Sequence, residues 1–69
     1  MSDKLISIVT PCFNEEQNIE KLCLEVEKIF KNLKYKYEHI VIDNKSTDKT
    51  RNILNSLFQK NKNLKVILN

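Results

Sequence analysis

The segment HIVIDNKSTDKT, residues 39–50, decides the fold class of this chain. It opens with a mostly β-branched run that ends in an acid, Asp43, and this pattern predicts a strand. The seven residues that follow can nearly all cap a helix, form a turn or bind a ligand. Ser46 or Thr47 is expected to cap a helix with Asp48 in its first turn. The segment therefore predicts a strand that delivers a carboxylate into a polar loop, from which a helix begins.

A strand and a helix are also predicted on the N-terminal side of this segment. The apolar run LISIVT, residues 5–10, indicates a first strand that Pro11 stops. Asn14 is a good helix cap, and Gln17 completes a capping-box spacing. A helix is expected from there to about Asn32, because apolar residues recur with helical period at Ile19, Leu22, Cys23, Val26, Ile29, Phe30 and Leu33.

Towards the C-terminus, the pattern repeats. A polar connection with two tyrosines, residues 34–38, is expected to precede the strand at 39–43. The helix that begins near Ser46 would bury a stripe made of Ile53, Leu54, Leu57 and Phe58. Residues 61–63 break this helix, and residues 64–68 (LKVIL) form a third strand. The order of elements is βαβαβ.

A βαβαβ order predicts an α/β fold with a parallel sheet and right-handed crossovers. Two such crossovers in one direction give the strand order 3-2-1 and place both helices on one face of the sheet. The strands carry apolar residues on both faces, as strands covered on both sides do. The second face and the open edge of the first strand therefore need a cover. We expect residues 1–69 to be an incomplete, Rossmann-like half of a three-layer domain, completed by a missing C-terminal half or by a partner.

Composition excludes several classes of function. The 69 residues allow one domain at most, and the net charge of +3 comes from scattered lysines, which does not suggest nucleic-acid binding. The absence of glycine rules out a Walker loop and a GxGxxG fingerprint. Cys12 and Cys23 form no metal or redox motif and are expected to be buried in a reducing compartment. Neither a secretory signal nor a run long enough to span a membrane occurs, so a cytoplasmic location is expected.

Ligands of open parallel sheets bind beyond the carboxyl ends of the strands, where two polar loops are expected, residues 10–16 and 43–50. Phe13 in one loop and Asp43 in the other suggest a flat ligand that is stacked and hydrogen-bonded at its edge. The alternative is that residues 44–50 merely start a helix. Glu15 and Glu16 are interpreted as helix-start acids, one of which reaches a ligand, rather than as an acid–base pair. His39 has no partner motif and is expected to be structural.

At these two loops the sequence resembles the family 2 glycosyltransferases, which have a GT-A fold. SIVTPCFNEEQNIEKL, residues 7–22, resembles the family signature of an apolar strand followed by P-x-Y-N-E and a helix. HIVIDNKSTDKT resembles the family's D-D-G-S-T-D-x-T segment, and LKVILN, residues 64–69, fits its third strand. The resemblance covers almost the whole chain. Within the family, the polyprenyl-phosphate glycosyltransferases of the dolichol-phosphate mannose synthase type look most similar.

The resemblance implies a nucleoside pocket lined by Pro11, Phe13 and Glu15, together with Ser46, in which Asp43 binds the edge of the base. Three positions depart from the family pattern. Phe13 replaces a tyrosine and keeps the stacking face without the hydroxyl. Asn44 replaces a second acid and removes a charge. Lys45 replaces a glycine, so that a turn with positive φ is expected to be difficult here.

The implied activity is transfer of a sugar from a UDP- or GDP-sugar to a polyprenyl phosphate, at the cytoplasmic face of the membrane in the full-length protein. The divalent cation that such enzymes use, Mg²⁺ or Mn²⁺, is held in the family by a D-x-D that lies after the third strand, as the catalytic base does. No catalytic or metal-binding residue is therefore assigned in this chain. Two alternatives stay open. One is a non-catalytic nucleotide-binding or interaction module, complete at this length or completed by a partner. The other is a small α/β enzyme with its active site at an oligomer interface.

Overall fold

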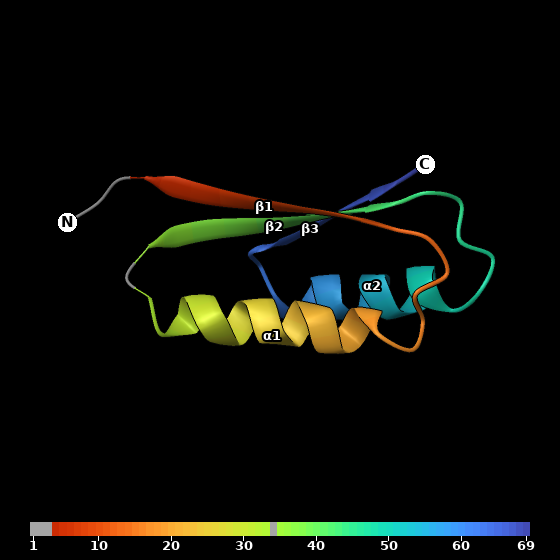
Figure 1. Ribbon diagram of the computed structural model, residues 1–69, viewed down its shortest axis with the longest axis horizontal. Helices are drawn as coiled ribbons and strands as arrows, with labels where there is room; N and C mark the ends of the chain where they lie inside the picture. Colours follow the sequence, from red (N-terminus) through yellow and green to blue (C-terminus); the bar gives the residue numbers. More distant parts are fainter. Residues whose placement is uncertain (1–3, 34) are drawn as a thin grey trace.

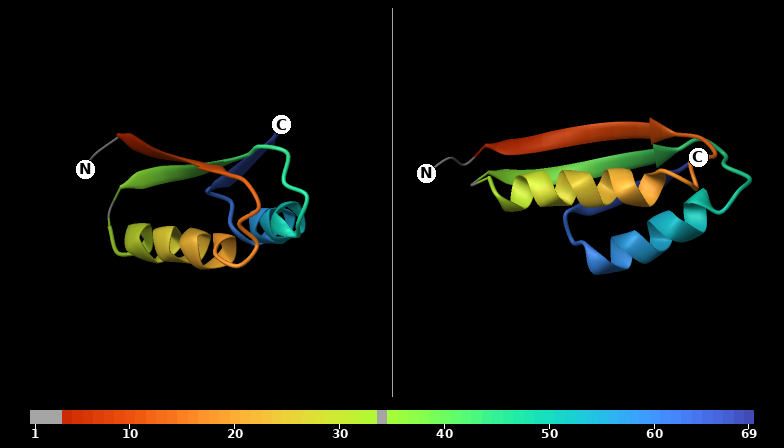
Figure 2. Two further views of the ribbon diagram at one scale, coloured as in Figure 1. Left: turned by 45° about the vertical axis from the view of Figure 1, so that its right-hand side comes forward. Right: turned by 60° about the horizontal axis from the view of Figure 1, so that its bottom comes forward.

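The computed structural model describes residues 4–33 and 35–69, which form a three-stranded sheet and two helices. In chain order these are β1 (Leu5–Cys12), α1 (Ile19–Lys31), β2 (Lys36–Asp43), α2 (Thr50–Lys60) and β3 (Leu64–Leu68). The strands are parallel and lie in the order β1-β2-β3, which confirms the predicted order 3-2-1. Both helices cover the same face of the sheet (Figures 1 and 2), as two right-handed crossovers require. The fold is therefore a partial Rossmann-like α/β unit.

The first two strands are longer than predicted. Pro11 does not stop β1 but lies within it, in register with Ile42 of β2. Proline is tolerated there because β1 is an edge strand, so that its missing N–H need not break a ladder on both sides. β2 begins at Lys36, within the segment expected to be a connection, and Tyr37 is buried with its ring stacked on Phe30 at 4.6 Å between centroids. Residue 34 of that expected connection lies outside the described residues.

Both helices begin later than predicted, and by a different capping arrangement. The N-cap of α1 is Asn18 rather than Asn14, and that of α2 is Lys49 rather than Ser46 or Thr47. Neither N-cap residue makes a side-chain hydrogen bond to its helix. The predicted caps are wrong because the side chains of Asn14 and Ser46 are engaged between two loops, as described below.

The core lies between the sheet and the two helices. Its buried members are Cys12, Ile19, Cys23, Val41, Leu54, Leu57 and Leu64. The predicted stripes are therefore confirmed in their centres, whereas Leu22, Ile29, Leu33 and Phe58 at their margins are exposed. Both cysteines are buried free thiols, and burial raises the pKa of each to about 11, to which the charge of Asp43 adds in the case of Cys12. Their predicted packing role is confirmed.

His39 is a buried member of the helix-facing layer of the sheet. It is 1% exposed, and its Nε2 lies 2.9 Å from Oγ1 of Thr10 on the neighbouring strand. Its backbone N–H donates to the carbonyl of Asn63. Burial lowers the pKa of His39 below its ordinary value of 6.5, so the neutral ring is the form that packs here. These contacts fit the structural role expected from the sequence.

The opposite face of the sheet carries no helix (Figure 1). Towards the carboxyl ends of the strands this open face presents Val9, Pro11 and Ile67, which are exposed, and Ile40 and Ile42, which are half-buried. Towards the amino ends it is polar, since the hydroxyl of Ser7 donates to the carboxylate of Glu38 at 2.5 Å. The apolar part of this face is the surface that, on the sequence argument, needs a cover.

Candidate functional site

Two loops lie next to each other at the carboxyl edge of the sheet (Figure 1): the first loop, residues 13–18 after β1, and the second loop, residues 44–49 after β2. They are neighbours because β1 and β2 are paired in parallel up to Cys12 and Asp43. The N–H of Asn44 continues the pairing by donating to the carbonyl of Cys12 at 2.9 Å. The structure thus brings together the two segments that the sequence singled out.

Asn14 joins the first loop to the second. Its backbone N–H donates to Oγ of Ser46 at 2.9 Å, and its side-chain Oδ1 accepts the N–H of Thr47 at 2.8 Å and that of Asp48 at 3.3 Å. Its φ is 50°, a left-handed conformation that asparagine adopts more readily than most residues. Asn14 is therefore a cross-link between the loops rather than the helix cap expected from its spacing.

A second set of bonds runs beside this one. The N–H of Glu15 donates to Oγ1 of Thr50 at 2.9 Å, and that of Glu16 to Oδ2 of Asp48 at 3.2 Å. Oδ1 of Asp48 accepts both the N–H and the hydroxyl of Thr50, at 2.9 and 2.5 Å. Although burial by itself raises the pKa of Asp48, the bonds from Thr50 and the Glu16 amide outweigh it and lower that pKa. We call Asn14, Ser46, Asp48 and Thr50 the loop clasp.

Asp43 ends β2 on the helix-facing side and is fully buried. Its carboxylate accepts the N–H of Ser46 at 3.1 Å, the hydroxyl of Ser46, and Nε–H of Arg51 at 2.6 Å, and it lies 3.6 Å from the thiol of Cys12. Burial alone raises the pKa of Asp43, but the bonds from Ser46 and Arg51 outweigh it, so the pKa lies below its ordinary value. The group is therefore an ionised anchor for the second loop and for the start of α2.

The predicted contact between Asp43 and a base edge is not available in this arrangement. Both oxygens are bonded to the protein's own donors, and a base could reach one only if Ser46 or Arg51 gave up its bond. The contact stays a prediction. Asn44, the next residue, is exposed instead, and its Oδ1 accepts an N–H from the side chain of Asn69 at 2.8 Å.

Arg51 and Asn69 are site residues that sequence reasoning missed. Arg51 bonds Asp43 and also donates from Nη2 to the carbonyl of Asn69, and the N–H of Asn69 donates to the carbonyl of Asp43 at 2.9 Å. The sequence offers one cue to this role, a cation eight residues after a strand-end acid. Its position in the first turn of a helix gives no further indication, because the partners of Arg51 come from the ends of two different strands.

The other predicted pocket residues are accessible. Phe13 is 57% exposed in the first loop, while Pro11 and Glu15 are exposed and line a hollow of about 270 Å³ beside the start of α1. Ser46 is half-buried beneath Asn14. The structure therefore bonds Asn14, the neighbour of Phe13, to Ser46 and leaves the Phe13 ring exposed, while Asp43 is buried.

Lys45 adopts φ of 59°, the left-handed conformation that the loss of a family glycine was expected to make difficult. The turn forms nevertheless, because the adjacent bond from the N–H of Ser46 to Asp43 holds it. The conformation costs a residue with a Cβ about 1–2 kcal/mol. The turn geometry is thus kept at the expense of local strain.

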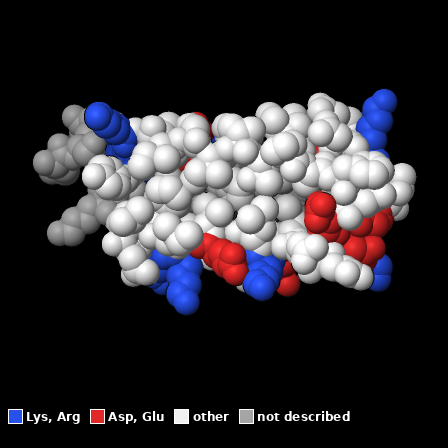
Figure 3. Space-filling view, viewed as in Figure 1, with Lys and Arg blue, Asp and Glu red and all other residues white. Residues whose placement is uncertain are grey.

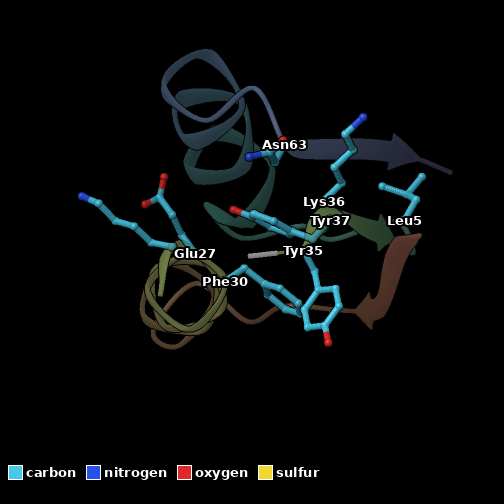
Figure 4. Close-up of a pocket in the computed structure, with 8 residues that line it drawn as sticks. Leu5, Glu27, Phe30, Tyr35, Lys36, Tyr37 and Asn63 are labelled. Carbon is cyan, nitrogen blue, oxygen red and sulfur yellow. The ribbon is translucent and has the colours of Figure 1, made fainter. Parts of the chain in front are cut away.

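A larger hollow, about 520 Å³, lies at the opposite end of the sheet (Figure 4). It is lined by Phe30, Tyr35 and Tyr37 together with the side chains of Leu5 and Lys36 and others near the end of α1. None of the predicted site residues lines it. The two loops and this hollow are therefore separate features of the molecule.

Acidic side chains gather on the lower side of the end at which the loops lie, whereas basic side chains are spread along the molecule (Figure 3).

Within residues 4–33 and 35–69, no three side chains of the metal-ligating types lie close enough to hold an ion. Over the same residues, neither helix has the length and apolar character needed to cross a bilayer.

A parallel βαβαβ sheet with two polar loops joined at its carboxyl edge is a partial Rossmann-like α/β fold, and in such folds ligands bind beyond the carboxyl ends of the strands. The family follows from comparison with known proteins. The chain belongs to glycosyl transferase family 2, whose model matches residues 7–69.

Three relatives illustrate the similarity. A Synechocystis protein named as an uncharacterized glycosyltransferase is 37% identical over 90% of this chain and 20% of its own length. An undecaprenyl-phosphate 4-deoxy-4-formamido-L-arabinose transferase of Pseudomonas fluorescens is 34% identical over 83% of this chain and 17% of its own. A dolichyl N-acetyl-alpha-D-glucosaminyl phosphate 3-beta-D-2,3-diacetamido-2,3-dideoxy-beta-D-glucuronosyltransferase of Methanococcus voltae is 42% identical over 93% of this chain and 20% of its own. The chain thus spans about a fifth of the length of the relatives it matches.

Proposed function

We propose that residues 1–69 form the nucleotide-sugar-binding part of a glycosyltransferase that transfers a sugar from a UDP- or GDP-sugar to a polyprenyl phosphate. The observation that carries the proposal is the pair of clasped loops at the carboxyl edge of the sheet, in a chain of glycosyl transferase family 2. The lipid acceptor is supported by two relatives whose names specify undecaprenyl and dolichyl substrates. Such an acceptor places the full-length protein at the cytoplasmic face of the membrane in this proposal.

The nucleoside is proposed to bind against the first loop. Phe13 supplies an exposed ring on which any base can stack, and Pro11 and Glu15 form the adjoining wall. We propose that Asp43 accepts a hydrogen bond from the base edge, provided that Ser46 releases its bond to one carboxylate oxygen. If Ser46 keeps its bonds, Asp43 affects the base indirectly, by holding the second loop in place. In either case stacking contributes affinity, and the second loop contributes the choice of base.

The transfer step needs a general base and metal ligands, and neither is assigned to a residue of this chain. In the proposal, a general base in the remainder of the enzyme deprotonates the acceptor phosphate, whose oxygen attacks the anomeric carbon of the donor. Mg²⁺ or Mn²⁺, bound there as well, would stabilise the departing nucleoside diphosphate. The residues of this chain bind and orient the nucleoside and take no part in the proton transfer.

Binding and transfer are tested separately on the full-length protein. Titration calorimetry with UDP, GDP, ADP and CMP should show UDP or GDP bound about tenfold more tightly than ADP and CMP, since only uracil and guanine offer a ring N–H to an acceptor on the protein. Phe13→Ala should weaken all four alike, while Phe58→Ala, at another exposed phenylalanine, on α2, should change none. Equal affinity for all four nucleotides contradicts the proposed base selection.

The transfer assay supplies labelled UDP- or GDP-sugar, polyprenyl phosphate and Mg²⁺ or Mn²⁺. Labelled lipid product is expected from the full-length protein, and none from residues 1–69 alone. Tight nucleotide binding without transfer would instead support the alternative of a non-catalytic nucleotide-binding module completed by a partner.

A further inference from the structure

Asn14 follows Phe13, whose ring is exposed, and it is bonded to the second loop through both its backbone and its side chain. We propose that Asn14 is a positioning residue, which sets where Phe13 lies relative to the second loop and so forms the nucleoside pocket before the ligand arrives. The inference rests on the proposed function, because it concerns affinity at that same pocket.

The chemistry of asparagine suits this position. Its amide oxygen has two lone pairs and accepts two successive backbone N–H groups, those of Thr47 and Asp48. Its short side chain makes these bonds while the backbone is left-handed, with φ of 50°. Over residues 4–33 and 35–69, no other acceptor is recorded for the N–H of Thr47. The conformation of the second loop therefore depends on Asn14 as well as on Asp43.

The bonds continue from Asn14 into the buried end of β2. Oγ of Ser46 accepts the N–H of Asn14, and the same hydroxyl donates to the carboxylate of Asp43. Asp43 is fully buried and is held in addition by Arg51. Asn14 is thus linked through Ser46 to a buried, hydrogen-bonded carboxylate at the end of β2.

Phe13, in contrast, has no anchor of its own that the structure records. Its side chain is 57% exposed, and it lies between Cys12 at the end of β1 and Asn14. Its direction is accordingly determined by the backbone of the two residues that flank it. If the bonds of Asn14 are lost, the ring must be ordered when the ligand binds, and that ordering weakens affinity. The loss should be similar for every nucleotide, since stacking does not distinguish bases.

The test uses Asn14→Gly in the full-length protein. Glycine adopts φ of 50° without cost, so this variant deletes the amide while sparing the left-handed turn. Gln17→Ala is the matched control, because Gln17 is exposed in the same loop and does not line the hollow beside Pro11 and Glu15. Calorimetry with UDP and GDP should show both bound about tenfold more weakly by Asn14→Gly, which corresponds to ~1.4 kcal/mol. Affinity within twofold of the parent protein would overturn the inference, and Gln17→Ala should retain parent affinity.

The double variant Phe13→Ala/Asn14→Gly separates positioning from general destabilisation. If Asn14 acts through Phe13, the double variant binds no more weakly than Phe13→Ala alone. If the two losses add, Asn14 acts on the fold or on another contact, and the inference is wrong. Amide exchange gives a readout that needs no ligand: the N–H groups of Thr47 and Asp48 should exchange faster in Asn14→Gly and at the parent rate in Gln17→Ala. Unchanged exchange would also overturn it.

The outcomes distinguish this inference from the proposed function. A parent protein that binds neither UDP nor GDP defeats the proposed function and the inference together. A parent protein that binds them, with an Asn14→Gly variant that binds them equally well, defeats only the positioning role.

Discussion

Replacing Asp43 by asparagine is expected to destabilise the fold even when no nucleotide is present. The carboxylate is fully buried and accepts bonds from Ser46 and from Arg51. Asparagine has the same shape but only one oxygen, whereas the carboxylate accepts the hydroxyl of Ser46 at Oδ1 and the N–H groups of Ser46 and Arg51 at Oδ2. With its nitrogen at the Oδ2 position, asparagine would oppose those two N–H donors; with its nitrogen at the Oδ1 position, it would lose the bond from the hydroxyl of Ser46. The substitution therefore removes the charge of the ion pair and at least one hydrogen bond from Ser46, with little change in volume.

The magnitude follows from the environment of the pair. A hydrogen bond to a charged group contributes about 1.5–3 kcal/mol. The side chain of Arg51 is 35% exposed, so solvent screening brings its share towards the lower end of that range. Adding the loss of a hydrogen bond from Ser46, we expect a loss of about 2–3 kcal/mol in the free energy of unfolding. A core in a chain of this size supplies about 3–5 kcal/mol, so the variant should be close to unfolding.

Urea unfolding followed by far-UV circular dichroism at pH 7 measures the effect. For a slope of about 1 kcal/mol per molar, the midpoint should fall by roughly 2 M or more, or the cooperative transition should be lost. Asn44→Ala is the control: it changes the adjacent, exposed residue, which makes one exposed bond to Asn69, and it should cost less than about 1 kcal/mol. An Asp43→Asn variant with parent stability that has lost its preference for uridine or guanosine nucleotides would refute the reasoning. In that case Asp43 would be a ligand contact rather than an anchor.

Three further predictions follow from strain, burial and exposure. Lys45→Gly should raise the free energy of unfolding by about 0.5–1 kcal/mol in urea titrations, because glycine relieves the left-handed conformation at φ of 59°; Lys45→Ala, which keeps the Cβ, should give no such gain. Burial lowers the pKa of His39 below 6.5, so the contribution of its neutral ring to stability is fully present above that pH and declines as the pH falls below it. The melting temperatures at pH 7.5 and 5.5 should therefore differ more for the parent than for His39→Gln, and equal differences would exclude this role. Residues 1–69 alone should bind a hydrophobic dye or self-associate through the open face of the sheet near Val9 and Ile40, and a sharp cooperative melt of a monomer without dye binding would contradict this.

The sequence alone was sufficient for the order of elements and for the topology. Apolar periods of 2 and 3.6 are local properties, and they located all five elements and the centres of both helix stripes. The handedness of crossovers then left one arrangement of three parallel strands, with both helices on one face. The same local information placed the two polar loops at one edge of the sheet. The family motifs in these loops lie within residues 7–69, which the family model matches.

The tertiary structure decided how the residues of those loops are used. Asparagine and serine are residue types that often cap helices, and the local sequence therefore assigns that role to Asn14 and Ser46. Their actual partners lie 32 to 34 positions away in the chain, and these become neighbours only because β1 pairs with β2 in the register that aligns Cys12 with Asp43. Asp43 was expected at the mouth of the site, but a strand alternates its side chains between two faces, and the register turns this one towards the helices, where Arg51 meets it. A single sequence does not encode register or long-range pairing in any local period, and for that reason the bonds that hold the site together could be seen only in the folded chain.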